Sequence, residues 1–125
     1  MRLLLDTNAV IHIRQNWPGF SSANRDLLSD PANTIYFSSV SAAEIAIKTS
    51  KGKLDIPVED LDQLVNLQGW TELPFTVHHA TKMLDLPDVH KDPFDRMIIA
   101  QALTEGLPVV TTDRLFSAYG VQVIQ

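Results

Sequence analysis

The chain has 125 residues, of which 45% are hydrophobic and 20% are charged, and its formal net charge is −5. These values are typical of one globular domain with its own core, and they argue against a disordered chain, a fibre or a coiled coil. No apolar run approaches the ~20 residues that span a bilayer, and the run at residues 3–5 meets Asp6 too soon for a signal-peptide core. The absence of cysteine excludes disulfides, thiolate metal ligands and a cysteine nucleophile, and it fits the cytoplasmic location that we expect.

The predicted elements alternate between short strands and helices. In chain order they are a strand at 2–5, a strand at 34–37, helices at 41–51 and 58–68, a weaker strand at 73–75, a helix at 77–86, a longer helix from Pro93 to the stop at Gly106, and strands at 108–112 and 121–124. This order indicates an α/β fold with a mainly parallel sheet, in a single domain over residues 1–125. In such sheets ligands bind beyond the carboxyl ends of the strands, so polar residues that follow strands are the first candidates for a site.

Two acids directly follow predicted strands. Asp6 comes after the strand at 2–5 and Asp113 comes after the strand at 108–112, and a helix is expected to begin at each acid. Aspartate is a favoured N-cap residue, so each acid alone has a purely structural explanation. The repetition of the arrangement indicates a shared site.

Two further acids lie near predicted helix starts. Glu44 is the third residue after Ser41, which matches a capping box, where the glutamate only returns a hydrogen bond to the helix start. Asp95 lies in the first turn of the helix that Asp92 caps, where any acid is stabilised by the helix dipole. The cap role suits Asp92, and we expect Asp95 to lie beside the strand ends.

One shared site explains the placement of these four acids better than four separate caps do. Without a cation they would repel one another, because two charges ~4 Å apart cost about 1 kcal/mol in water and about 4 kcal/mol at an effective dielectric constant of 20. Mg²⁺ and Mn²⁺ prefer carboxylate and water oxygen, so either ion would remove this repulsion. The remaining acids and bases then nearly balance, and the negative net charge does not exclude nucleic acid as a partner.

The chain resembles a PIN domain, specifically a VapC-type ribonuclease toxin of bacterial toxin–antitoxin systems. The resemblance spans nearly the whole chain and is carried by four segments, Leu3–Asn8, Ser41–Ile45, Asp92–Arg96 and Thr111–Asp113. It implies a three-layer α/β/α fold and a catalytic, metal-binding set of acids, namely Asp6, Glu44, Asp95 and Asp113. Asn8 and Thr112 match the polar residues around that set. Asp92 is an extra acid, which we interpret first as a cap and second as a site residue.

The resemblance also implies an activity and partners. The activity is Mg²⁺- or Mn²⁺-dependent cleavage of single-stranded or looped RNA, with one or two bound ions. Water activated by the metal would attack the phosphodiester, so we expect 5′-phosphate and 3′-hydroxyl ends. The implied protein partners are a small antitoxin, which wraps the toxin and places a basic side chain in the acidic site, and a second copy of the chain in a homodimer. The amphipathic segment 58–68 serves either the core or such an interface.

Three basic side chains are candidates for contact with RNA. Lys48 and Lys51 follow Glu44 at helical spacing, which fits an ordinary glutamate–lysine pair as well as a phosphate contact. Arg96 fits either a role in orienting the neighbouring carboxylate or a phosphate contact. The histidines lack the spacing of zinc ligands, and we expect His90 in a solvated loop.

Three other functions are alternatives to the nuclease. A phosphate-responsive receiver-type signalling domain needs an adjacent acidic pair after the first strand and a lysine after the last one, but here Thr7 follows Asp6 and Arg114 follows Asp113. A phosphatase of the haloacid dehalogenase type needs an aspartate where this chain has Asn8. A catalytically silent PIN-like binding module is the third alternative, and the presence of all four acids favours the nuclease over it.

Overall fold

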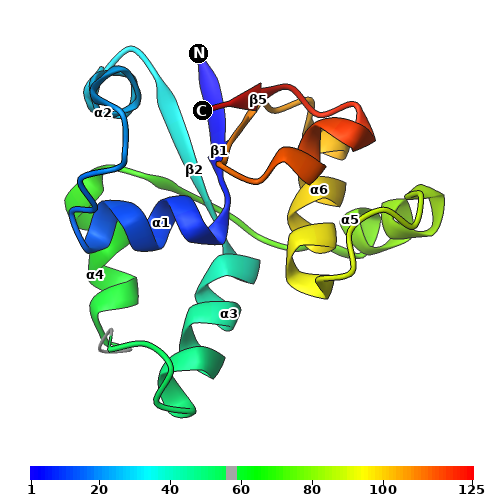
Figure 1. Cartoon of the computed structure of the whole chain (residues 1–125), viewed down its shortest axis with the longest axis horizontal. Helices are drawn as coiled ribbons and strands as arrows, with labels where there is room; N and C mark the ends of the chain where they lie inside the picture. Colours follow the sequence, from blue (N-terminus) through cyan, green and yellow to red (C-terminus); the bar gives the residue numbers. More distant parts are fainter. Residues whose placement is uncertain (56–58) are drawn as a thin grey trace.

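A five-stranded sheet organises the computed structural model, which describes residues 1–55 and 59–125 (Figure 1). The strands are β1 (Arg2–Leu5), β2 (Thr34–Ser38), β3 (Thr71–Leu73), β4 (Val109–Val110) and β5 (Val123–Ile124). The helices are α1 (Thr7–Arg14), α2 (Ser22–Ser29), α3 (Ser39–Ser50), α4 (Glu59–Gln68), α5 (Val77–Lys82) and α6 (Pro93–Glu105), with 3₁₀ segments η1 (Met83–Asp85) and η2 (Arg114–Tyr119). None of the described helices has the length and apolar character that a bilayer span requires.

The strand order β3-β2-β1-β4-β5 places β1 at the centre, and all four strand pairings are parallel. Leu5 pairs with both Phe37 and Val110, so the residues that follow β1, β2 and β4 emerge at the same edge of the sheet. The chain proceeds from β1 to β2 on one side and later returns to β4 on the other. The edge between β1 and β4 is therefore the switch point at which α/β sheets bind ligands.

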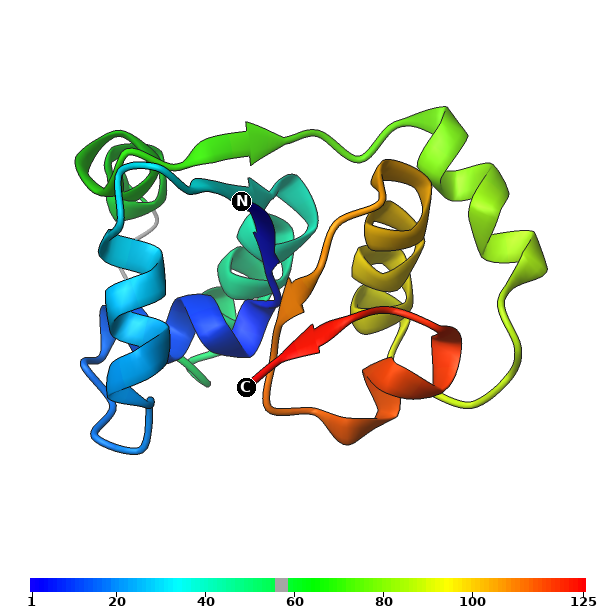
Figure 2. The same ribbon diagram turned by 90° about the horizontal axis from the view of Figure 1, so that it is seen from above.

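Two apolar cores cover the two faces of the sheet. Because side chains alternate along a strand, Leu3 and Leu5 pack on one face, where α1, α2 and α4 cover them, while Leu4 packs on the other face against α6 and η2. Figure 2 shows these two groups of helices on opposite sides of the sheet. This arrangement confirms the expected three-layer α/β/α fold.

Most predicted elements are present, with different limits. The helix expected at 77–86 is α5 followed by η1, the strand expected at 73–75 lies at Thr71–Leu73, and β4 and β5 are shorter than expected. The helix expected at 58–68 is α4, and its expected first residue, 58, lies outside the described residues. The helix α2 was not predicted, because only three of its eight residues are apolar. Ser21 caps it by accepting a hydrogen bond from the backbone of Asn24.

The predicted capping box at Ser41 is wrong. The N-cap of α3 is Ser38, whose Oγ accepts from the backbone N–H of Val40 at 3.0 Å, so the helix begins earlier. Ser41 is instead a buried residue inside α3, and its Oγ lies 3.0 Å from Oγ1 of Thr7 in α1. Glu44 therefore has no capping role, and it lies in the second turn of the helix rather than at its start.

Candidate metal site

The four predicted acids converge at the carboxyl end of the sheet, and we call Asp6, Glu44, Asp95 and Asp113 the acidic site. Asp6 follows β1 and caps α1, Asp113 follows β4 and caps η2, and Asp95 lies in the first turn of α6. In Figure 1, α1 and α3 begin where β1 and β2 end. The charges of Glu44 and Asp113 act on Asp6, and those of Asp6 and Glu44 act on Asp95. The structure thus brings together carboxylates from four separate parts of the sequence.

Asp6 is buried at the centre of this group. Its Oδ1 accepts from the backbone N–H of Ala9 at 2.7 Å, and its Oδ2 accepts from Oγ1 of Thr111 at 2.5 Å. Burial raises the pKa of Asp6 to about 6, against these two hydrogen bonds, and the nearby negative charges of Asp113 and Glu44 add to the rise. The carboxylate is therefore held in one orientation at an electrostatic cost.

Asp95 shows the same conflict more strongly. Burial and the charge of Asp92 raise its pKa to about 7, with smaller contributions from Asp6 and Glu44, while His90 opposes the rise. Neighbouring acids with raised pKa values are typical of a cation site, because a divalent ion stabilises their charged forms.

Glu44 supplies an unused ligand atom. Its side chain is buried, and Oε2 forms an ion pair with Nζ of Lys48 at 2.7 Å. The other oxygen, Oε1, is buried and has no hydrogen-bond partner among the described residues. A buried carboxylate oxygen without a partner is costly, so a ligand of positive charge at this point would satisfy it.

His90 also belongs to this region, and its expected place in a solvated loop is wrong. The residue is buried, and Nε2 of its ring lies 2.7 Å from Oδ2 of Asp113 and 3.1 Å from Oδ2 of Asp95. One atom from each of these three side chains lies within 4.8 Å of the others. The position two residues before the N-cap Asp92 was the available signal, because a side chain there can accept from the backbone of the cap, as in an Asx turn.

The polar residues expected around the acids differ in placement. Thr112 is exposed, and its neighbour Thr111 contacts the site instead, donating to Asp6 and accepting from the backbone N–H of Asp113 at 3.0 Å. Asn8 lies in the first turn of α1 and is exposed. Asp92 has the expected cap role, since its Oδ1 accepts from the backbone of Phe94 at 2.9 Å.

The basic candidates are placed as follows. Lys48 is paired with Glu44, and this hydrogen bond is the main reason that the pKa of Lys48 is raised. Lys51 is exposed at the end of α3. Arg96 donates from Nη1 to the carbonyl of Pro87 at 2.9 Å and to the hydroxyl of Tyr119 at 3.3 Å, so it fastens the loop before α6 rather than a carboxylate.

The donor set suits a hard divalent cation. Carboxylate oxygens with little competing nitrogen or sulfur are the ligands of Mg²⁺ and Mn²⁺. The free oxygen of Glu44 and the raised pKa values of Asp6 and Asp95 show that these residues fit such an ion.

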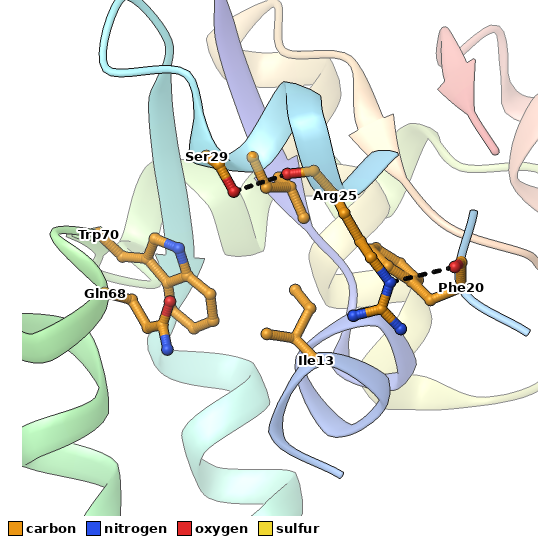
Figure 3. A pocket seen from close by; sticks show the side chains of 7 residues that line it. Ile13, Phe20, Arg25, Ser29, Gln68 and Trp70 are labelled. Atoms are coloured by element: carbon orange, nitrogen blue, oxygen red, sulfur yellow. Dashed lines mark hydrogen bonds between the residues drawn. The ribbon is translucent and has the colours of Figure 1, made fainter. Parts of the chain in front are cut away.

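A separate cavity of about 380 Å³ lies between α1, α2 and the segment that joins α4 to β3 (Figure 3). Its lining combines apolar and aromatic side chains with polar ones, and it is formed by Ile13, Phe20, Arg25, Leu28, Ser29, Gln68 and Trp70. Arg25 is fixed there, because it donates to the carbonyls of Phe20 and Trp17. None of the four acids lines this cavity, so it is distinct from the acidic site.

Comparisons with known proteins agree with the fold. The structure of VapBC2 from Rickettsia felis bound to a promoter DNA fragment matches at a TM-score of 0.76 and 21% identity, over 99% of this chain and 98% of that chain. FitAcB from Neisseria gonorrhoeae matches at 0.67 and 25% identity, over 98% and 96%. The PIN domain endonuclease Utp24 matches at 0.55 and 18% identity, over 98% and 82%. No curated protein sequence matches the chain.

The family model for the PIN domain matches residues 3–122, which is nearly the whole chain and includes all four acids of the acidic site. The chain therefore belongs to the PIN domain family.

Proposed function

We propose that this protein is a Mg²⁺- or Mn²⁺-dependent endoribonuclease and the toxin of a toxin–antitoxin pair. The observation that carries the proposal is the convergence of four carboxylates at the switch point of a PIN fold, two of them with raised pKa values. The similar structures include toxin–antitoxin complexes and a PIN endonuclease, which supports the assignment.

The contacts of the residues in and around the acidic site suggest a role for each of them. Asp6, Glu44, Asp95 and Asp113 would hold one or two ions, which when bound lower the pKa of water and stabilise charge on the phosphate and on the leaving 3′ oxygen. Thr111 and the start of α1 fix both oxygens of Asp6, so this carboxylate needs no reorientation. Lys48 holds one oxygen of Glu44 and leaves the other free. Lys51, which is exposed, stays a candidate for contact with RNA phosphate.

A cleavage assay tests the proposal. Single-stranded and structured RNAs are incubated with the protein in Mg²⁺, Mn²⁺ or EDTA, and Asp95→Asn is compared with wild type after its folding has been checked. We expect cleavage that requires the metal, leaves 5′-phosphate ends and is lost in the variant. A folded, metal-loaded protein that cleaves none of these RNAs, or cleavage that persists in EDTA, would count against the nuclease; metal binding without cleavage would favour the silent binding module.

We propose a small antitoxin as the protein partner, seated in the cavity beside α1. This helix begins at Asp6 of the acidic site and carries Ile13 of the cavity, so a bound chain that runs along α1 can reach both. Leu61 and Leu64 of the predicted amphipathic segment pack in the core, whereas Leu67, in the described part of the same segment, is exposed. Competition between the partner and RNA for the protein checks this placement.

A homodimer is the second proposed assembly. Val77 of α5 and Leu84 of η1 are 84% and 85% exposed, which is unusual for large apolar side chains close together in sequence. A second copy that covers them would remove this surface from water. Light scattering of wild type and Leu84→Glu tests the assembly: we expect a dimer that the substitution disrupts, and a wild-type monomer would rule it out.

A further inference from the structure

Contacts to both the backbone and the ring fix His90, although it lies in the loop before α6. The hydroxyl of Tyr119 accepts from the backbone N–H of His90 at 2.6 Å and from that of Val89 at 3.3 Å. Arg96 donates to the same hydroxyl and to the carbonyl of Pro87, and the ring of Phe116 packs edge-on against the imidazole at 6.1 Å between centroids. The imidazole is therefore a rigid part of the site.

The hydrogen bonds of the ring fix where its proton lies. A backbone N–H can only donate, and the N–H of Asp92 points at Nδ1 of His90 from 3.1 Å, so Nδ1 carries a lone pair. The ring proton is then on Nε2, which lies 2.7 Å from Asp113 and 3.1 Å from Asp95. This N–H donates to Asp113, and the oxygen of Asp95 lies close to the same nitrogen.

The same geometry argues against metal ligation by His90, despite its place in a three-residue cluster with Asp95 and Asp113. A ligand nitrogen must present a lone pair, so ligation through Nε2 would move the proton to Nδ1. That proton would face the backbone N–H of Asp92, and two donors would oppose each other at 3.1 Å.

We infer that His90 is a positioning residue, which uses its Nε2–H to hold Asp113 beside Asp95 and is not itself a metal ligand. This inference rests on the proposed metal-dependent nuclease. It assigns the histidine to the support of the acids, where partners that orient ligands are worth about 10- to 100-fold in metal affinity.

Two measurements on the full chain test the inference. Long-range ¹H–¹⁵N correlation spectra of the histidine rings are recorded without metal and with saturating Mg²⁺, and the His90 signals are identified by their loss in His90→Gln. Calorimetric titration with Mn²⁺ then compares wild type, His90→Ala and His90→Gln, whose amide N–H can take the place of Nε2–H. His79→Gln is the matched control, because His79 is also buried, accepts a backbone N–H at Nδ1 and contacts a carboxylate through Nε2.

We expect the proton on Nε2 both with and without Mg²⁺. His90→Ala should weaken Mn²⁺ binding ~10- to 100-fold, while His90→Gln stays within about threefold of wild type and His79→Gln is unchanged. Loss of the Nε2 proton on adding Mg²⁺, or a His90→Gln variant as weak as His90→Ala, would overturn the inference. If wild type binds neither ion, the proposed function fails, and the metal-free spectrum alone decides: a proton on Nε2 supports the positioning role and a proton on Nδ1 overturns it.

Discussion

Two buried histidines of this protein have nearly the same hydrogen bonds but different surroundings. His79 accepts from the backbone N–H of Thr76 at 3.0 Å through Nδ1, and its Nε2 lies 3.1 Å from Oε2 of Glu105. His90 repeats this pattern with the backbone of Asp92, but its Nε2 lies between two carboxylates. We call the contact of His79 with Thr76 and Glu105 the His79 seam; it joins α5 to the last turn of α6, ten residues and ~15 Å from Asp95 in the first turn.

The difference shows what converts a structural contact into a chemical site. In the His79 seam one carboxylate, 34% exposed, meets one histidine, and the contact fastens two helices. In the acidic site several carboxylates are gathered away from water, and burial raises the pKa values of two of them. Keeping these carboxylates charged therefore costs stability, and such a cost is typical of functional sites.

The largest expected separation between the two regions comes from matched carboxyl-to-amide substitutions. Asp6→Asn should reduce RNA cleavage by at least ~100-fold, since loss of a metal ligand removes several kcal/mol of transition-state stabilisation. Glu105→Gln, in the His79 seam, should leave the cleavage rate within about twofold. Single-turnover cleavage rates of the two folded variants check this, and equal losses in both would break the comparison.

The pH dependence should separate the regions next. Burial raises the pKa of Asp6 from 3.8 to about 6 and that of Asp95 to about 7. These two groups therefore contribute most to the stability of the metal-free fold below about pH 4, and this contribution is lost as the pH rises to 6 and 7. We expect Asp6 alone to account for a decrease of ~2–3 kcal/mol in the free energy of unfolding between pH 4 and pH 8. Metal affinity should rise over the same range, because protons and cations compete for these oxygens.

Denaturant unfolding in EDTA at several pH values measures the first effect, and calorimetry with Mn²⁺ measures the second. Asp6→Asn serves as the control, because the amide removes one of the two titrating groups and should reduce the pH dependence of stability. Metal-free stability that increases from pH 5 to pH 8 would contradict the raised pKa values.

A change in the His79 seam should affect stability alone. His79→Ala removes a buried side chain, its capping hydrogen bonds and its stacking on Phe75, where the ring planes are 1° apart, so we expect a loss of ~1–3 kcal/mol in the free energy of unfolding. Mn²⁺ affinity should not change. Denaturant unfolding and calorimetry on the same sample check both, and a coupled loss of affinity would show that the two regions are not independent.

The smallest expected effect comes from Lys48. Its ammonium pairs with Glu44 and therefore opposes a second positive charge there, so Lys48→Ala should strengthen Mn²⁺ binding by less than about fivefold. Lys51→Ala is the control, because Lys51 is exposed at the end of the same helix. Weaker Mn²⁺ binding in Lys48→Ala would mean that the lysine orients Glu44 rather than competing with the ion.

The sheet and the positions of Asp6 and Asp113 after its strands could be predicted from the sequence, because both depend on local signals. A buried apolar run that ends in an aspartate, as at Asp6, marks a strand end and a helix start together, and the register of β1 with β4 then brings Asp113 to the same edge. Spacing alone placed Glu44 in a capping box, because Ser38 and Ser41 are both plausible caps and only the packing of Ser41 on Thr7 distinguishes them.

The residues around the acids were harder to predict, because their roles depend on three-dimensional contacts. Thr111 and Thr112 are chemically identical neighbours, and only the direction in which the chain leaves β4 decides which one reaches Asp6. The burial of His90 beside the acids depends on Asp113 and Tyr119, more than 20 residues away in sequence, so its position before the cap Asp92 is a local signal that does not reveal these contacts.

The most direct test of the acidic site as a metal centre is calorimetric titration of the RNA-free protein with Mn²⁺ at pH 8, for wild type and Asp95→Asn. We predict that wild type binds one or two ions and that the variant, with its fold intact, loses at least one of them or binds ~10- to 100-fold more weakly. Wild-type protein that takes up no Mn²⁺, or a variant that binds it as tightly as wild type, would contradict the assignment of these acids to a metal-dependent nuclease.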